Sequence, residues 1–178
     1  MKSPTSTVKM TARQRAEIET GVKCVYLLDL PYVKVGQLRK HMETLKFHMK
    51  SIINLSYVGK QVVECLISDT DIRSFRLNAR KHHIGLHENF NPMNIRNHTL
   101  DFWLSDLQHK TAQELCTDFI KRMAKEVAGS NNPLTSEFYR MWAIGLGESK
   151  RFYDNLRNIK TSVRVLAILA NLFRKPQT

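Results

Sequence analysis

The spacing of apolar and polar positions changes several times along the chain, and each change predicts a new element. Four runs are rich in β-branched and aromatic residues, which predicts strands: 22–30, 51–58, 61–67 and 84–90. Residues 35–47 and 69–81 instead carry apolar side chains three and four positions apart, which predicts amphipathic helices. The resulting order, β-α-β-β-α-β, is typical of the split βαβ or ferredoxin-like arrangement.

Helical signals also flank this predicted module. Thr11 precedes a short helix that we expect to end at Gly21. The second half of the chain has the pattern of a bundle of about four helices, two of which begin after Thr99 and Thr111. We therefore expect an α+β protein with three parts: a tail and short helix at 1–21, an α/β sandwich at 22–90, and a helical module at 91–178.

Composition adds information about partners. The 178-residue chain has 28 Lys and Arg against 16 Asp and Glu, a formal net charge of +12. Such an excess favours a polyanionic partner, either a nucleic acid or an anionic membrane surface. The longest apolar run, which contains 165–169, is too short to span a bilayer, and the N-terminus lacks the apolar core of a secretory signal. We expect an intracellular protein, cytoplasmic or nuclear, with no membrane span.

The sequence has little that points to catalysis or metal binding. Cys24, Cys65 and Cys116 are widely spaced, so we expect reduced and mostly buried thiols rather than a disulfide framework. The histidine-rich stretch 82–88 lacks a second ligand pair, which disfavours a zinc site. Phosphate-loop, dinucleotide-binding and nucleophile-elbow motifs are absent, although a pair such as Cys65 and His83 could meet in the folded chain. We expect no metal, no cofactor and no enzymatic activity.

One short string on the first predicted strand points to a function. Side chains on a strand alternate between its two faces, so if Val25 and Leu27 face the helices, Tyr26 lies on the open face of the sheet. An aromatic ring there can stack on a base. The string VYLLDL around Tyr26 resembles the shorter ribonucleoprotein motif of RNA-recognition-motif (RRM) domains. That family has further aromatics on its third strand, where this chain has Val62 and Glu64, so we expect a limited, RRM-like stacking platform.

A longer resemblance extends over residues 26–67. Its parts are YLLDLP at 26–31, Leu38-Arg39, I-x-NLSYVG at 52–59 and E-x-LI at 64–67. This stretch is similar to the nucleic-acid-binding segment of gag-like, first-reading-frame proteins of fungal non-LTR retrotransposons. The resemblance implies RNA binding and a role as a ribonucleoprotein partner or chaperone. Unlike proteins of that family, this chain has no zinc knuckle after the segment.

Basic residues recur on the predicted helices. On the second helix of the sandwich and on the last helix, cations stand at i, i+3 and i+7, which places each set on one helix face. The two sets are Arg73, Arg76 and Arg80, and Arg157, Lys160 and Arg164. Each cation placed on a phosphate releases a counterion and strengthens binding at low salt. The remaining expected nucleic-acid contacts are Tyr26, Tyr57, Lys34, Arg39, Lys40, Lys60 and Lys81.

These observations predict an RNA-binding protein of low sequence specificity, because phosphate contacts position a nucleic acid without reading its sequence. We expect single-stranded or structured RNA rather than DNA. The alternative is a protein-interaction or assembly module whose sheet face, including Tyr26, is covered by the C-terminal helices or by a second subunit. The charge favours the first interpretation, and the missing third-strand aromatics favour the second. A homo-oligomer or a protein partner fits either.

Overall fold

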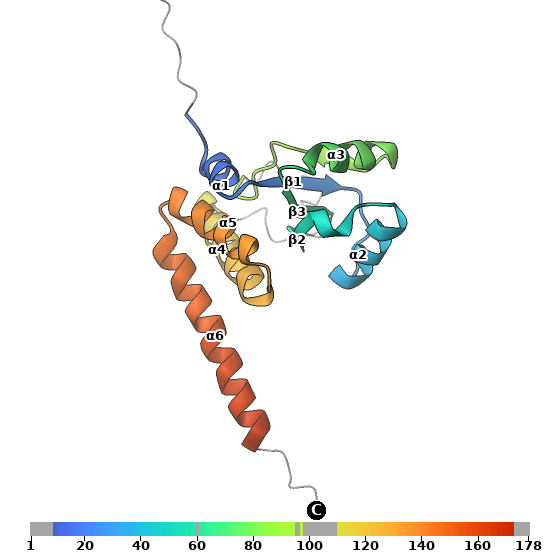
Figure 1. Cartoon of the computed structure of the whole chain (residues 1–178). Coiled ribbons are helices and arrows are strands. Elements are labelled where there is room, and N and C mark those ends of the chain that lie inside the picture. The colour runs from blue at the N-terminus through green and yellow to red at the C-terminus, as the bar shows by residue number, and fades with distance from the viewer. Residues whose placement is uncertain (1–8, 60, 95–96, 98–109, 173–178) are drawn as a thin grey trace, which may run out of the picture.

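The structure, a computed structural model, describes residues 9–59, 61–94, 97 and 110–172. It is α+β, with a four-stranded antiparallel sheet and six α-helices in that part of the chain (Figure 1). The strands are β1 (Val22–Leu28), β2 (Ile52–Tyr57), β3 (Val62–Ser68) and β4 (Gly85–His87). The helices are α1 (Ala12–Thr20), α2 (Val35–Thr44), α3 (Ile72–Lys81), α4 (Ala112–Gly129), α5 (Pro133–Gly145) and α6 (Ser149–Leu172).

The strands lie in the order β2-β3-β1-β4, and each neighbouring pair is antiparallel. The expected order of elements is present, but β1, β2, β4, α2 and α3 are shorter than the pattern indicated. β1 ends two residues early because Asp29 adopts a left-handed backbone with φ of 65°. The last strand has only three residues, Gly85–His87, rather than the expected 84–90. A tight connection joins β2 to β3, where the Val58 N–H donates to the Val62 carbonyl at 2.9 Å.

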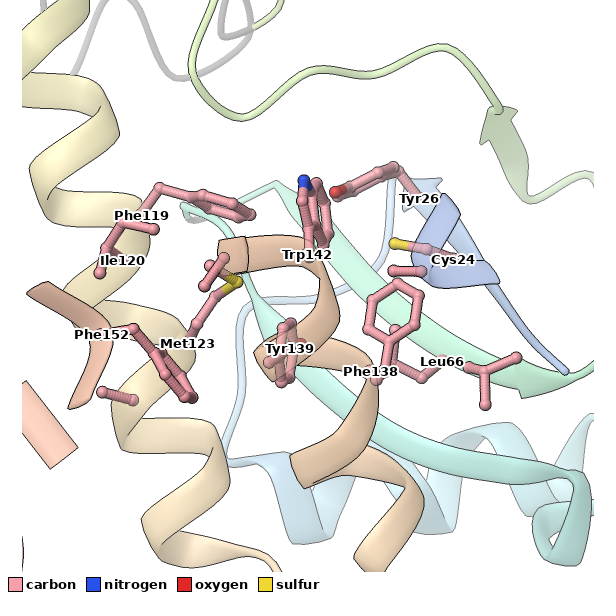
Figure 2. Close-up of a cluster of buried hydrophobic side chains, with 14 of the residues drawn as sticks. Cys24, Tyr26, Leu66, Phe119, Ile120, Met123, Phe138, Tyr139, Trp142 and Phe152 are labelled. Carbon is pink, nitrogen blue, oxygen red and sulfur yellow. The ribbon is translucent and has the colours of Figure 1, made fainter. Parts of the chain in front are cut away.

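Each face of the sheet is covered by a different pair of helices. Val25 and Leu27 point toward α2 and α3 and share a core with Leu38 and Phe75. The opposite face packs against α4 and α5, and Figure 2 shows how side chains of both helices meet this face. Side chains of this second core include Cys24, Tyr26, Leu66, Phe119, Ile120, Met123, Phe138, Tyr139 and Trp142. Sheet and helical module thus share one core.

Local capping signals place both ends of α1 and the start of α4 where the sequence predicts them. Thr11 and Thr111 each form a capping box, with Gln14 and Glu114 respectively at the third helical position. Gly21 ends α1 with φ of 66°, a conformation that glycine adopts at low cost. The start of the helix expected after Thr99 lies outside the described residues.

Helix α1 belongs to the helical side of the molecule. It packs against α5 (Figure 1). The approach is close: a Cβ added at Gly145 would lie 2.8 Å from the Cβ of Ala12. Only a residue without a side chain fits α5 at this crossing. The N-terminal helix and the C-terminal module, far apart in sequence, are therefore one packed unit against the sheet.

Candidate functional site: a covered sheet and a basic helical face

The sheet face that carries Tyr26 is closed, so the expectation that this ring is available for stacking is wrong. Tyr26 has 0% of its surface exposed. Its ring packs against Phe90, with centroids 4.6 Å apart, and the Arg13 guanidinium lies 5.9 Å from the ring centroid. In this fold a base cannot reach Tyr26, which is a core residue because helices of the same chain cover it.

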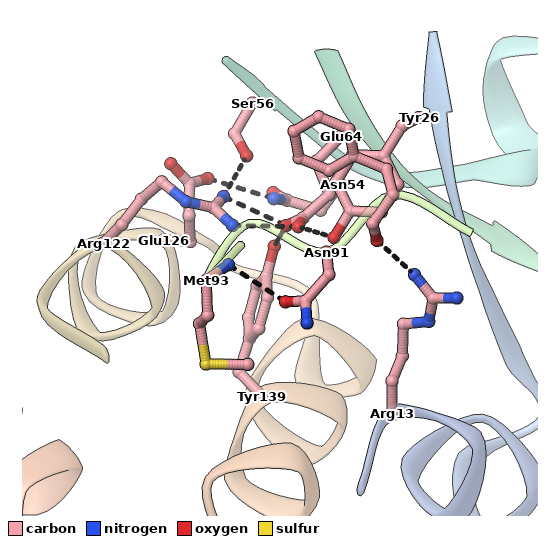
Figure 3. Close-up of polar contacts among 11 residues, drawn as sticks. Arg13, Tyr26, Asn54, Ser56, Glu64, Asn91, Met93, Arg122, Glu126 and Tyr139 are labelled. Carbon is pink, nitrogen blue, oxygen red and sulfur yellow. Dashed lines mark hydrogen bonds and ion pairs between the residues drawn. The ribbon is translucent and has the colours of Figure 1, made fainter. Parts of the chain in front are cut away.

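A buried ion pair joins β3 to α4 on this face (Figure 3). Glu64, with 0% exposure, accepts hydrogen bonds from Arg122 Nη1 at 3.0 Å and Nη2 at 2.8 Å. The Tyr26 hydroxyl donates to Glu64 Oε2 at 2.7 Å, and the Tyr139 hydroxyl donates to Oε1. Arg122 Nη1 also donates to Ser56 Oγ at 2.9 Å. Donors from α4, α5 and β1 thus converge on one carboxylate of β3.

The charge state of this cluster follows from its contacts. Burial by itself raises the pKa of Glu64, but the charge of Arg122 and the hydrogen bonds from Arg122, Tyr139 and Tyr26 outweigh it, and the pKa lies below its ordinary value. Burial raises the pKa of both phenols well above the ordinary range. Glu64 is therefore an ionised acceptor at neutral pH, and the two tyrosines remain neutral donors.

A second polar contact lies beside the ion pair. Asn54 on β2 donates from Nδ2 to Glu126 Oε2 on α4 at 3.0 Å. Burial raises the pKa of Glu126, and the hydrogen bond from Asn54 opposes that shift. Two polar side chains of the covered sheet face, Asn54 and Glu64, therefore have hydrogen-bond partners on α4. This indicates an intramolecular docking surface rather than an exposed nucleic-acid platform.

Sequence reasoning missed this cluster, although a signal for it existed. Glu64 is the one charged residue in the apolar run 62–67, and a carboxylate at such a position needs a cation. Arg122 lies between Phe119 and Met123, which are both core residues of α4. A lone acid on a strand and a lone cation on an apolar helix face are thus each other's partners.

The cations of α2 and α3 lie on the opposite side of the sheet and reach solvent. We call the following set the basic face: Lys34, Arg39, Lys40, Arg73, Arg76, Arg80 and Lys81. Arg39 and Arg76 are half-buried and the others are exposed. Arg76 pairs with Glu88 at 2.8 Å; the other members form no ion pair with any residue that the structure describes. Helix α3 itself contains no acidic residue, so its positive charge is largely uncompensated.

The cations of α6 belong to the other side of the molecule. The apolar side of this helix, with Phe152 and Ile159, packs into the core beside α4. Arg157, Lys160 and Arg164 are exposed, and Arg157 is 3.4 Å from Asp154. The structure therefore separates the two predicted cation sets by the sheet and its covering helices. Lys60, the remaining predicted contact, lies outside the described residues.

The predicted aromatic Tyr57 lies at the end of β2 and is half-buried on the α2 side. Its hydroxyl donates to the Pro31 carbonyl at 2.7 Å and accepts from the Val33 N–H at 3.2 Å. Its ring meets Tyr32 edge to face, with centroids 5.0 Å apart and an interplanar angle of 75°. Tyr57 thus supports the β1–α2 loop, and Tyr32 is the ring that this loop exposes. Sequence reasoning did not single out Tyr32.

Comparisons with protein-family models, with curated proteins and with solved structures found no match to this chain. Within the described ranges, no group of three or more His, Cys, Asp or Glu side chains is placed to hold a metal ion. In the same ranges, no helix combines the length and the apolar character needed to cross a membrane.

Proposed function

We propose that this protein binds RNA with low sequence specificity and contacts the phosphates through the basic face. The carrying observation is the largely uncompensated positive charge of α3 and the start of α2, on the side of the sheet that none of the described helices α4, α5 and α6 covers. Phosphates are the natural ligands of such a surface, because each cation that contacts one releases a counterion. The resemblance to retrotransposon gag-like proteins adds the role of a ribonucleoprotein partner or chaperone.

We infer further that residues 22–87 are a ferredoxin-like unit. The inference is supported by the order β1-α2-β2-β3-α3-β4, by the antiparallel pairing of all neighbouring strands, and by the packing of α2 and α3 on one face. In this proposal the unit differs in use from an RRM. The helix layer contacts RNA, while the sheet face binds the chain's own α4 and α5.

A protein-interaction or assembly module is the second candidate, and the covered sheet face favours it. The helices that cover this face belong to the same chain, however, so the cover does not by itself require a partner. The excess of positive charge has no role in this candidate. A protein that self-associates but does not bind RNA at low salt would favour it over the first.

A salt titration of RNA affinity tests the proposed function. Binding of a labelled single-stranded RNA should weaken steeply with salt, with a log–log slope of about 0.7 for each phosphate contact. Exchange of Arg73, Arg80 and Lys81 for Glu should weaken binding and reduce that slope by about 2. We leave Arg76 unchanged because it pairs with Glu88.

The matched control is the exchange of Arg157, Lys160 and Arg164 for Glu, which changes the net charge by the same amount on α6. The basic-face variant should lose more affinity than this control. If the α6 variant loses more, the site lies on the helical module. Affinity that stays constant between low and moderate salt would refute phosphate binding altogether.

A further inference from the structure

The loop between β1 and α2 presents an aromatic ring that neither core uses. Tyr32 is 63% exposed. Its only recorded ring contact within the described residues is the edge-to-face contact with Tyr57, which leaves most of the ring accessible. Isolated apolar side chains are common on protein surfaces, so exposure alone decides nothing. Two further features indicate that Tyr32 binds a ligand: the hydrogen bonds that hold its loop, and the charged residues near it in the chain.

Tyr57 fixes this loop on both sides of Tyr32. Its hydroxyl is bonded to the carbonyl of Pro31 and to the N–H of Val33, the two residues that flank Tyr32 in the chain. The ring of Tyr57 supports the ring of Tyr32 directly. A ring that is already held in place loses little conformational freedom when a ligand stacks on it.

The charge around the loop selects the ligand. Lys34, two residues after Tyr32, is exposed and is the first cation of the basic face. Lys40 and Arg39 follow on α2. A flat ring beside cations matches a nucleotide of a single strand, which has a flat base beside a phosphate. These three cations follow Tyr32 in the chain, against one exposed acid, Asp29, that precedes it, and this excess of positive charge favours a polyanion over a purely apolar protein partner.

We propose that Tyr32 stacks on a base of single-stranded RNA while Lys34 contacts a neighbouring phosphate. This inference rests on the proposed function and adds its base contact. It moves the stacking residue from Tyr26, which the fold buries, to a loop on the side of the basic face. Every base has a flat face, so such stacking agrees with low sequence specificity.

The test compares a short labelled oligouridine with an oligomer of equal length and backbone that lacks the bases, by fluorescence anisotropy. Exchange of Tyr32 for Ala should weaken oligouridine binding by about 5- to 150-fold, the usual effect of losing one base–aromatic stack. Binding of the baseless oligomer should not change. Tyr32→Phe and Tyr32→Trp should retain affinity, because both keep a ring. Tyr32→Leu, which keeps much of the bulk of the side chain without the ring, should lose as much oligouridine affinity as Tyr32→Ala.

Two controls separate stacking from charge. Tyr153→Ala removes an exposed tyrosine from α6 and should leave the affinities for oligouridine and for the baseless oligomer unchanged. Lys34→Ala should weaken the binding of both oligomers and reduce the log–log slope of affinity against salt by about 0.7. If Tyr32→Ala loses the same affinity for both oligomers, or loses none, the stacking inference is overturned while phosphate binding is left intact. A wild-type protein that binds neither oligomer would overturn the proposed function, and this inference with it.

Discussion

The buried ion pair between Glu64 and Arg122 allows a sharp test of how the helical module docks on the sheet. Glu64 is 0% exposed and the Arg122 side chain is 17% exposed, so neither group recovers its hydration when the other is removed. Removing one partner of such a pair costs about 3–5 kcal/mol. We therefore expect Arg122→Met to lower the free energy of unfolding by about that amount at neutral pH, as measured by urea unfolding followed by circular dichroism.

The pH dependence gives a second, independent signature. In the wild-type protein the pKa of Glu64 lies below its ordinary value of 4.5, so its stabilising contribution is present above that value and is lost as the pH falls through the folded-state pKa. In Arg122→Met only the hydrogen bonds from Tyr26 and Tyr139 oppose the effect of burial, so the pKa of Glu64 rises and the ionised form costs stability as the pH rises. The difference in stability between the two proteins should therefore shrink from pH 7 toward pH 5.

Two further variants complete the test. Glu64→Gln combined with Arg122→Met should recover part of the loss, because the Gln side chain carries no charge and can still pair with both phenols, its oxygen accepting from one hydroxyl and its amide N–H donating to the other. Arg140→Met breaks an exposed pair with Glu137 and should cost at most about 1 kcal/mol. A free energy of unfolding for Arg122→Met within about 1 kcal/mol of the wild type would show that the ion pair does not hold α4 on the sheet. A loss of stability that is independent of pH would show the same.

Two other predictions concern the same packed unit. Gly145→Ala should destabilise the protein by about 1–3 kcal/mol, because the new Cβ would clash with Ala12, and the melting temperature should fall; Gly36→Ala, with open space around the new Cβ, should be neutral or slightly stabilising. Tyr26→Phe should cost about 1–3 kcal/mol in urea unfolding, because the buried Glu64 loses a donor, while RNA affinity of the folded variant stays at the wild-type level. A Tyr26→Phe variant of normal stability and reduced RNA affinity would show that the sheet face contacts RNA after all.

Local sequence signals determined the element order, both ends of α1 and the start of α4. Thr11 and Thr111 form their capping boxes with residues three positions away, and Gly21 ends α1 through its own backbone. These interactions depend on neighbours in the chain, so a sequence pattern is sufficient to predict them. The alternation along β1 likewise predicted that Val25 and Leu27 share one face, which the structure packs against α2 and α3. The same alternation put Tyr26 on the opposite face but contained nothing about what covers that face.

The tertiary structure decided the state of the sheet face and the position of the accessible aromatic ring. Glu64 and Arg122 are 58 residues apart, and no periodic pattern connects them. Their pairing depends on where α4 docks, which side-chain packing and desolvation determine together. Tyr32 and Tyr57, 25 residues apart, meet because the β1–α2 loop lies beside the end of β2. Composition alone predicted a polyanionic partner, whereas the fold determined which cations and which ring are free to meet it, because burial depends on contacts between distant segments.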